Sequence, residues 1–300
     1  MKVGLYNIEP KIENTALMQI SHYHKTKGDQ VEWYEENLWG YDKVYCSSLF
    51  DFTDKSKVPP QAIRGGTGFD LTSKLPFDCN LDYSLYPACD CSYIWFSRGC
   101  IRYCGFCVVR DKEGKIKAVT PKNLNPNGKY IKIQDNNFFA SPSWPDAIEW
   151  LKATGQPVEF AGGLDVRLMD KDKCDAVNTL KHEKQIKIAW DNPKQDLMPK
   201  LTELTKYIKG YRLMCYVLIG YNSTVDEDID RVKKLHKLGI TPYAMCIDRN
   251  DPEQKRFQKW TNHFFHKTME FAGFDYNEYV KSKRAANEVP KLLFKQEIEK

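Results

Sequence analysis

Three cysteines in one short segment are spaced closely enough to bind metal together. Cys100, Cys104 and Cys107 lie in SRGCIRYCGFCVVR and are separated by three and then two residues. Thiolates are ligands for zinc and for iron-sulfur clusters, but structural zinc sites usually bring cysteines in pairs and use four protein ligands. The segment offers no evident fourth ligand. We therefore expect a four-iron cluster in which one iron stays open to a further ligand.

The segment resembles the cluster-binding loop of the radical S-adenosylmethionine (SAM) superfamily. That loop has the pattern Cys-x3-Cys-x2-Cys with an aromatic residue before the last cysteine, a position that Phe106 holds here. The resemblance implies a 4Fe-4S cluster on the three cysteines, SAM at the open iron and an external one-electron donor. It further implies reductive cleavage of SAM to methionine and a 5'-deoxyadenosyl radical. That radical would abstract hydrogen from a substrate that the sequence does not identify, while the protein supplies ligation, orientation and a dry cavity.

Other interpretations of the cysteines remain open. The three could be buried small hydrophobic residues or an incomplete zinc site, or the chain could be a non-catalytic iron-sulfur protein. A nucleic-acid-modifying enzyme of the methylthiotransferase type is a further alternative, because Cys46 and Cys79 could match two of the three cysteines in its front domain. They would match the later two, and the first would fall near Asn7, where no cysteine stands. Cys79, Cys89 and Cys91 could also hold an auxiliary cluster, although ordinary thiols are the simpler interpretation.

From residue 92 onward, apolar segments alternate with amphipathic helical patterns. The expected strands lie near 92–97, 130–134, 157–161, 186–190, 212–219 and 241–247. One face of the helix expected after the fifth strand consists of Val225, Ile229, Val232, Leu235 and Leu238. This alternation predicts an α/β fold with right-handed crossovers and a parallel sheet, either doubly wound or curled into a barrel. The resemblance implies a partial (β/α)6 barrel over residues 91–250, closed by a helical segment over 251–300.

Polar residues follow the second and third of these strands, where functional side chains gather in parallel α/β folds. The resemblance makes Asp135, Asn136 and Asn137 contacts for the methionyl amino group of SAM, although this sequence also suits a turn. It makes Asp165 and Arg167 contacts for cofactor or substrate. Arg167 could bind a carboxylate with two hydrogen bonds, or it could form a surface ion pair with a nearby aspartate.

The fourth and fifth strands end in further candidates. The resemblance places Asp191 where it would accept the ribose hydroxyls of SAM, with an Asx turn as the alternative. Leu218 and Gly220 resemble positions that contact adenine in the family. Ser223 or Thr224 more simply caps the helix that follows.

Residues 1–90 predict a smaller α/β unit followed by an irregular linker. The linker is the segment 51–90, which is rich in Asp, Lys, Pro and Gly. The unit resembles a reduced cobalamin-binding domain, but the Asp-x-His-x-x-Gly segment that binds cobalamin is absent from the sequence, so we expect no cobalamin. The expected elements are strands at 2–8, 30–34 and 41–46, and a helix at 14–27 that begins after a possible Asn14 cap.

Composition and charge narrow the classes of partner. The 300 residues include 45 basic and 40 acidic side chains, and the net charge of +5 suits an acidic small molecule without requiring nucleic acid. Ten cysteines without a signal-peptide pattern are typical of thiols in a reducing compartment. No run of about 18 apolar residues is present, so we expect a cytoplasmic protein without membrane contact. The segment KRFQKWTNHFFHK mixes basic and aromatic residues, and we expect Phe257, Trp260, Phe264 and Phe265 to close the barrel rather than bind nucleic acid.

Overall fold

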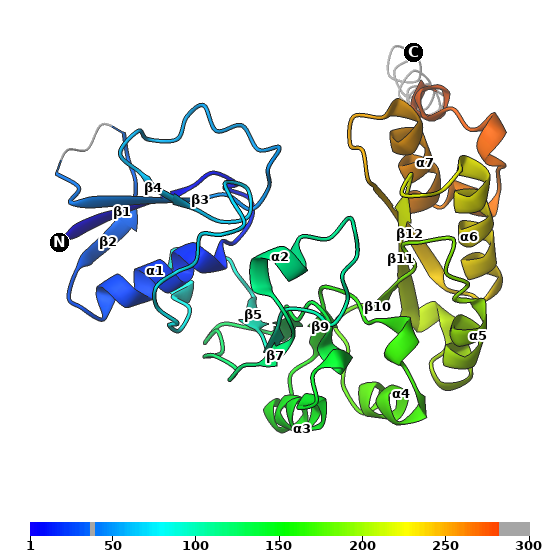
Figure 1. Ribbon diagram of the computed structural model, residues 1–300, viewed down its shortest axis with the longest axis horizontal. Helices are drawn as coiled ribbons and strands as arrows, with labels where there is room; N and C mark the ends of the chain where they lie inside the picture. The colour runs from blue at the N-terminus through cyan, green and yellow to red at the C-terminus, as the bar shows by residue number, and fades with distance from the viewer. Residues whose placement is uncertain (37–39, 282–300) are drawn as a thin grey trace, which may run out of the picture. The chain divides into compact units, whose positions relative to one another are not determined.

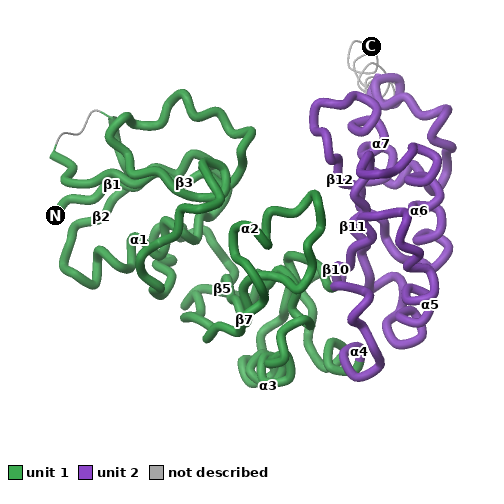
Figure 2. Tube along the Cα trace, in the orientation of Figure 1, with its two compact units in different colours: residues 1–164, 175–184 green, residues 165–174, 185–300 purple. Residues whose placement is uncertain are grey.

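A computed structural model describes residues 1–36 and 40–281 of the chain. The chain forms two compact units (Figure 2). Unit 1 contains residues 1–164 and 175–184, and unit 2 contains residues 165–174 and 185 onward. None of the described helices is long and apolar enough to cross a membrane.

A parallel sheet and one helix form the N-terminal part of unit 1 (Figure 1). The strands are β1 (Lys2–Asn7), β2 (Gln30–Trp33), β3 (Lys43–Ser47) and β4 (Ile63–Gly65), in the order β2-β1-β3-β4. Helix α1 (Thr15–Lys25) connects β1 to β2, and the Asn14 side chain caps it by accepting from the amides of Ala16 and Leu17 at 3.1 and 3.2 Å. The expected strands, helix and cap are confirmed. The segment expected to be irregular contributes one further strand, β4, which pairs with β3.

The second sheet of unit 1 leads into the segment with the three closely spaced cysteines. Its parallel strands are β5 (Cys91–Ile94), β8 (Tyr130–Ile133) and β9 (Val158–Phe160). The short strands β6 (Ser97–Arg98) and β7 (Lys117–Ala118) pair antiparallel. The helices of this part are α2 (Val109–Glu113), α3 (Trp144–Thr154) and the 3₁₀-helices η1 (Tyr83–Leu85) and η2 (Phe138–Ala140). Edge-to-face contacts of Phe138 with Phe96 and Phe160, with ring centroids 6.0 and 5.2 Å apart, fill part of the core.

Unit 2 is built on a parallel sheet of β10 (Ile186–Ala189), β11 (Leu213–Ile219) and β12 (Thr241–Cys246). Figure 1 shows α5 and α6 packed along this sheet, with α7 following β12. The helices are α5 (Met198–Tyr207), α6 (Val225–Lys237), α7 (Pro252–Asn262) and the 3₁₀-helices η3 (Val166–Leu168), η4 (Gly210–Arg212), η5 (Phe265–Lys267) and η6 (Phe271–Gly273). Helix α4 (Lys171–Asn178) contains one of the points where the chain passes between the units.

The α/β class with parallel strands is confirmed, because all six strands expected after residue 92 are present and parallel to their sheet neighbours. Among the described strands, they form one group of three in unit 1 and one in unit 2. The partial barrel stays a prediction.

The expected C-terminal helical segment is confirmed for α7, and the residues from 282 onward lie outside the described part of the chain. Phe257 and Trp260 are buried as expected. Phe264 was expected on the same face, but that prediction is wrong. It follows the end of α7 in a left-handed conformation, with φ of 64°, and stays 47% exposed.

Candidate functional site

The three cysteines lie in the loop between β6 and α2, and Gly99 gives this loop its entry. Gly99 has φ of +82°, and a Cβ at this position would lie 2.4 Å from the carbonyl oxygen of Lys115 and 2.7 Å from that of Gly114. The Cys100 amide donates to the Gly114 oxygen at 3.3 Å. The two ends of the loop are therefore held against each other, and only glycine fits where they meet.

All three thiols are partly accessible, and none is in a disulfide. The Arg102 amide donates to the Cys100 sulfur at 3.3 Å, and the Cys107 amide donates to the Cys104 carbonyl at 3.0 Å. Phe106, the aromatic residue before the last cysteine, is half-buried in the same loop. Backbone amides that face thiolate sulfur favour the charged, ligating form of cysteine.

The donor set of this loop fits a thiolate-ligated cluster. Within the described residues, no three His, Cys, Asp or Glu side chains gather as they would around a single metal ion. A four-iron cluster does not need that arrangement, because each thiolate binds a different iron. Three accessible thiols in one glycine-closed loop are the ligands that such a cluster takes.

Glu113, at the end of α2, holds the loop in place, and sequence reasoning missed it. Its carboxylate accepts hydrogen bonds from the Gly99 amide at 2.8 Å and the Asn136 side-chain amide at 2.8 Å. It also forms an ion pair with Arg98 at 2.6 Å. Charge-assisted hydrogen bonds of this kind are about twice as strong as neutral ones. Glu113 thus joins the entry of the cysteine loop to the segment after β8.

We expect Glu113→Ala to loosen the cysteine loop. The substitution leaves the Gly99 amide and the Asn136 amide without this acceptor, at a cost of about 2 kcal/mol, or roughly 30-fold in local opening. Hydrogen exchange of the Gly99 amide measures this directly. Asp111→Ala is the matched control on the same helix, because its exposed side chain accepts only a weak 3.3 Å bond from Tyr103. Equal protection of Gly99 in both variants would show that Glu113 does not hold the loop.

The residues after β8 lie against the cysteine loop. The Asn137 side-chain amide donates to the Cys100 sulfur at 3.7 Å. Asp135 is buried, and its carboxylate accepts from the Phe96 amide at 2.9 Å and the Ser97 hydroxyl at 2.5 Å. Burial raises the pKa of Asp135 to about 6 despite these bonds. Asp135 therefore positions the residues between β5 and the cysteine loop. Asn137 contacts Cys100, one of the three proposed cluster ligands.

Asp165 and Arg167 in unit 2 form the ion pair that the sequence left open as an alternative. The Asp165 carboxylate accepts from Nε and Nη2 of Arg167 at 2.6 and 3.1 Å, and it also caps η3 at the Arg167 amide. Nη1 of Arg167 donates to Gln195 at 3.0 Å. The Arg167 side chain is about one-third exposed, so it still faces solvent.

Asp191 follows β10 and differs from these residues in its surroundings. The Asx turn at this point is made by Asn192, which accepts from the Lys194 amide at 2.9 Å. In the described part of the chain, the Asp191 carboxylate accepts no hydrogen bond from a protein donor. Burial raises its pKa to about 6, while the charges of Arg231 and Arg167 act in the opposite direction. An acceptor without a protein donor at a strand end is placed to receive donors from a ligand.

We expect Asp191→Asn to stabilise unit 2 at pH 7. The raised pKa means that folded Asp191 binds more protons than unfolded Asp191 between about pH 4 and pH 6, so its contribution falls as the pH rises through that window. Removing the carboxylate should add about 1 to 3 kcal/mol at pH 7 and flatten the pH dependence. Hydrogen exchange of β10 and β11 amides measures both effects. Asp90→Asn is the control, because the Asp90 carboxylate is exposed and makes only a 3.6 Å ion pair with Lys129. A similar gain in stability from Asp90→Asn would contradict the assignment of the pH effect to Asp191.

Arg231 on α6 ties together the ends of β10 and β11 and was not foreseen. The side chain is 1% exposed and donates to the carbonyls of Trp190 at 2.6 Å and Leu218 at 2.7 Å. It also pairs with Asp228, whose other oxygen accepts from the Gly220 amide at 3.1 Å. The buried stripe of α6 is Asp228, Arg231, Val232 and Leu235, which differs from the purely apolar face expected. Leu218 and Gly220 are thereby fixed, and their contact with adenine stays a prediction.

The cap of α6 follows expectation. Thr224 accepts from the Glu227 amide, and the Glu227 carboxylate accepts from the Thr224 amide at 2.8 Å, which completes a capping box. Ser223 instead accepts from the Gly220 amide at 3.1 Å. Of the two candidate capping residues, Thr224 is the cap.

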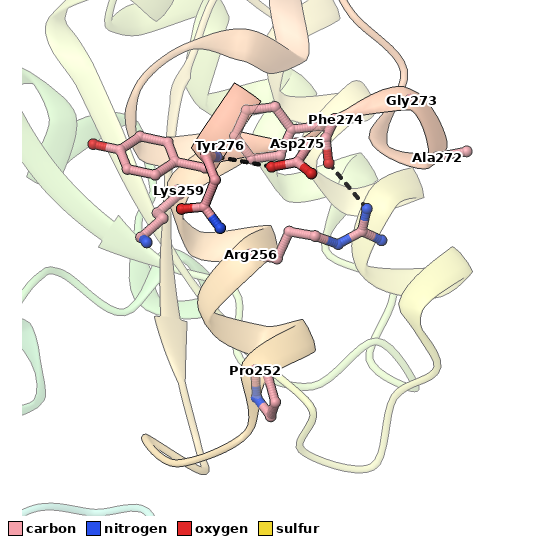
Figure 3. A pocket seen from close by; sticks show the side chains of 9 residues that line it. Pro252, Arg256, Lys259, Ala272, Gly273, Phe274, Asp275 and Tyr276 are labelled. Carbon is pink, nitrogen blue, oxygen red and sulfur yellow. Dashed lines mark hydrogen bonds between the residues drawn. The ribbon is translucent and has the colours of Figure 1, made fainter. Parts of the chain in front are cut away.

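A cavity of about 460 Å³ lies beside α7, and its lining contains none of the predicted site residues (Figure 3). Two charged side chains in its wall are engaged within the protein. Arg256 donates to the Phe274 carbonyl at 3.1 Å, and Asp275 accepts from the Asn277 amide at 2.8 Å. We therefore assign no ligand to this cavity.

The predicted site residues fall into two sets. The three cysteines, Phe106 and residues 135–137 belong to unit 1, whereas Asp165, Arg167, Asp191, Leu218 and Gly220 belong to unit 2. No protein-family model matches the chain, and neither does any curated protein. The functional interpretation therefore rests on the residues themselves.

Proposed function

We propose that this chain is a radical SAM enzyme that abstracts hydrogen from a substrate still to be identified. The observation that carries the proposal is the loop with Cys100, Cys104 and Cys107 at Cys-x3-Cys-x2-Cys spacing, which lies between β6 and α2, shortly after the first strand of the α/β series, β5. The contact of Asn137 with the Cys100 sulfur supports it, because it joins the loop to the end of the next strand of that sheet.

The three thiolates would hold a 4Fe-4S cluster. When bound, the cluster supplies the electron that cleaves SAM into methionine and a 5'-deoxyadenosyl radical. The chain's own residues set the conditions for this step. Amide donors to sulfur, from Arg102 and Asn137 to Cys100, withdraw charge from the thiolate and favour reduction. Glu113 keeps the loop ends together while the thiolates bind.

Two proposals concern the rest of the cofactor site. We propose that the parallel strands of both units belong to a partial (β/α)6 barrel, and that Asp191 accepts the ribose hydroxyls of SAM. The absence of a protein donor to Asp191 in the described residues supports this role. The carboxylate is ionised above about pH 6, where it is the stronger acceptor.

Anaerobic reconstitution tests the proposal. We expect about four irons and four sulfides per chain, and formation of 5'-deoxyadenosine when the reduced protein meets SAM. About eight irons would instead indicate the methylthiotransferase alternative with a second cluster. A loaded cluster that forms no 5'-deoxyadenosine, with or without native cell extract, would favour the non-catalytic iron-sulfur protein. Acceleration by a fraction of the extract would lead to the substrate.

A further inference from the structure

Two cysteines outside the proposed cluster form a buried pair at the start of β5. Cys89 and Cys91 are 5% and 4% exposed, and their sulfur atoms are 3.9 Å apart. Cys79, which was considered together with them for an auxiliary cluster, does not join this pair in a group of three metal-ligating side chains within the described residues. Two thiols this close together can react with each other directly.

The backbone around the pair is held rigidly. The buried Asn125 side chain donates to the carbonyls of both Cys89 and Cys91, at 2.8 and 3.2 Å. The Cys89 amide donates to the Tyr86 carbonyl at 2.9 Å. Because a single residue separates the cysteines, their α-carbons are at most about 7 Å apart, and disulfides join α-carbons about 4.4 to 6.8 Å apart. The sulfur atoms need to approach by only about 1.9 Å to reach the bonded distance.

The surroundings make the two thiols unequal. The hydrogen bond from Cys89 lowers the pKa of Cys91, and the hydroxyls of Tyr93 and Tyr130 and the charge of Lys132 act in the same direction against burial. The same hydrogen bond and burial raise the pKa of Cys89. Cys91 is therefore the nucleophile, and Cys89 keeps its proton until it is needed.

We propose that Cys89 and Cys91 form a reversible disulfide when the protein meets a peroxide, and that this pair is an oxidative modification site. The Cys91 thiolate attacks one oxygen of hydrogen peroxide, giving a sulfenic acid and hydroxide. The Cys89 thiol then attacks the sulfenic sulfur, and water leaves. In total the two thiols lose two electrons and two protons, and the peroxide becomes two waters. A small dithiol supplies the electrons for the return.

Peptide masses test this inference independently of the proposed function. The tryptic peptide 75–98 contains Cys79, Cys89 and Cys91, so the experiment uses full-length Cys79→Ser protein, in which the pair is alone. Native protein is treated with a limiting dose of hydrogen peroxide, denatured, alkylated with N-ethylmaleimide and digested. We expect the peptide to carry no alkyl group and to be lighter by two hydrogens, and dithiothreitol should restore two alkylation sites. The control is Cys215, a thiol in another peptide whose pKa is raised by burial, and it should react at least about tenfold more slowly because little of it is thiolate.

Two variants separate the roles of the thiols. Cys89→Ser should leave Cys91 as a sulfenic acid that dimedone traps, whereas Cys91→Ser should leave Cys89 reduced at the same dose. The Cys79→Ser protein keeps both buried cysteines, so the measurement on its peptide remains valid even if the Cys89→Ser or the Cys91→Ser variant fails to fold. Two alkyl groups on that peptide, at a dose that oxidises the partly exposed Cys246, would overturn the inference. Separate overoxidation of the two sulfurs would overturn it as well.

Discussion

Cys104→Ala protein should form no 5'-deoxyadenosine above the level seen without enzyme. Cys104 is the middle ligand of the proposed cluster, and alanine offers no donor to the iron that this thiolate would bind. A cluster left with two thiolates from this loop should not survive reconstitution. The loss should therefore appear in both iron content and SAM cleavage, and the two measurements should agree.

The choice of control decides what such a loss means. Cys246→Ala removes a thiol of comparable exposure at the end of β12, and we expect iron content and cleavage to stay at the parent level. Cys104 lies in a loop with partial exposure, so its removal should change the free energy of unfolding by only about 0.5 kcal/mol. If Cys104→Ala cleaved SAM at the parent rate, the loop could not be the source of the electron, and the proposed function would fall. If Cys246→Ala lost SAM cleavage to the same extent, the loss in Cys104→Ala could not be assigned to the cysteine loop.

Much of the fold could be predicted because its signals are local. Each strand after residue 92 is a short apolar run, and its position follows from composition over a few residues. The caps at Asn14 and Thr224 depend on side chains that reach amides two or three residues away. The cysteine spacing is local in the same sense. These features need no knowledge of distant contacts.

The side chains that fix the site depend on distant contacts, and the sequence did not reveal them. Glu113 accepts from Gly99, 14 residues earlier, and from Asn136, 23 residues later, so in RDKEGK it resembles an ordinary surface charge. Arg231 and Asp228 do not belong to the apolar face that the sequence predicts for α6, yet both are buried. The helix turns this face inward because backbone carbonyls at the ends of two strands, 41 and 13 residues away, accept from Arg231. Burial of a charge becomes evident only when its partners are known.

Arg231→Ala should destabilise unit 2 by about 3 to 5 kcal/mol, the range for removing one partner of a buried ion pair. The variant leaves the Asp228 carboxylate, which is 3% exposed, without its ion-pair partner. It also removes the Arg231 donor from the carbonyls of Trp190 and Leu218. Hydrogen exchange of the Trp190 amide, which donates to Tyr216 across β10 and β11, measures the opening free energy at this point. Lys234→Ala on the same helix is the matched control. Its ion pair with Asp230 is exposed, so its loss should cost less than about 1 kcal/mol.

A second substitution shows whether the unpaired Asp228 carboxylate causes the loss of stability in Arg231→Ala. Asp228→Asn alone should destabilise unit 2, because it weakens the acceptor of both Arg231 and the Gly220 amide. In the Arg231→Ala background the same change should instead recover stability, since it removes an uncompensated buried charge. The sign reversal corresponds to a coupling of at least about 1 kcal/mol. Additive losses would mean that Arg231 acts through its backbone carbonyls alone, and that the pair with Asp228 contributes little to holding Leu218 and Gly220 at the strand end.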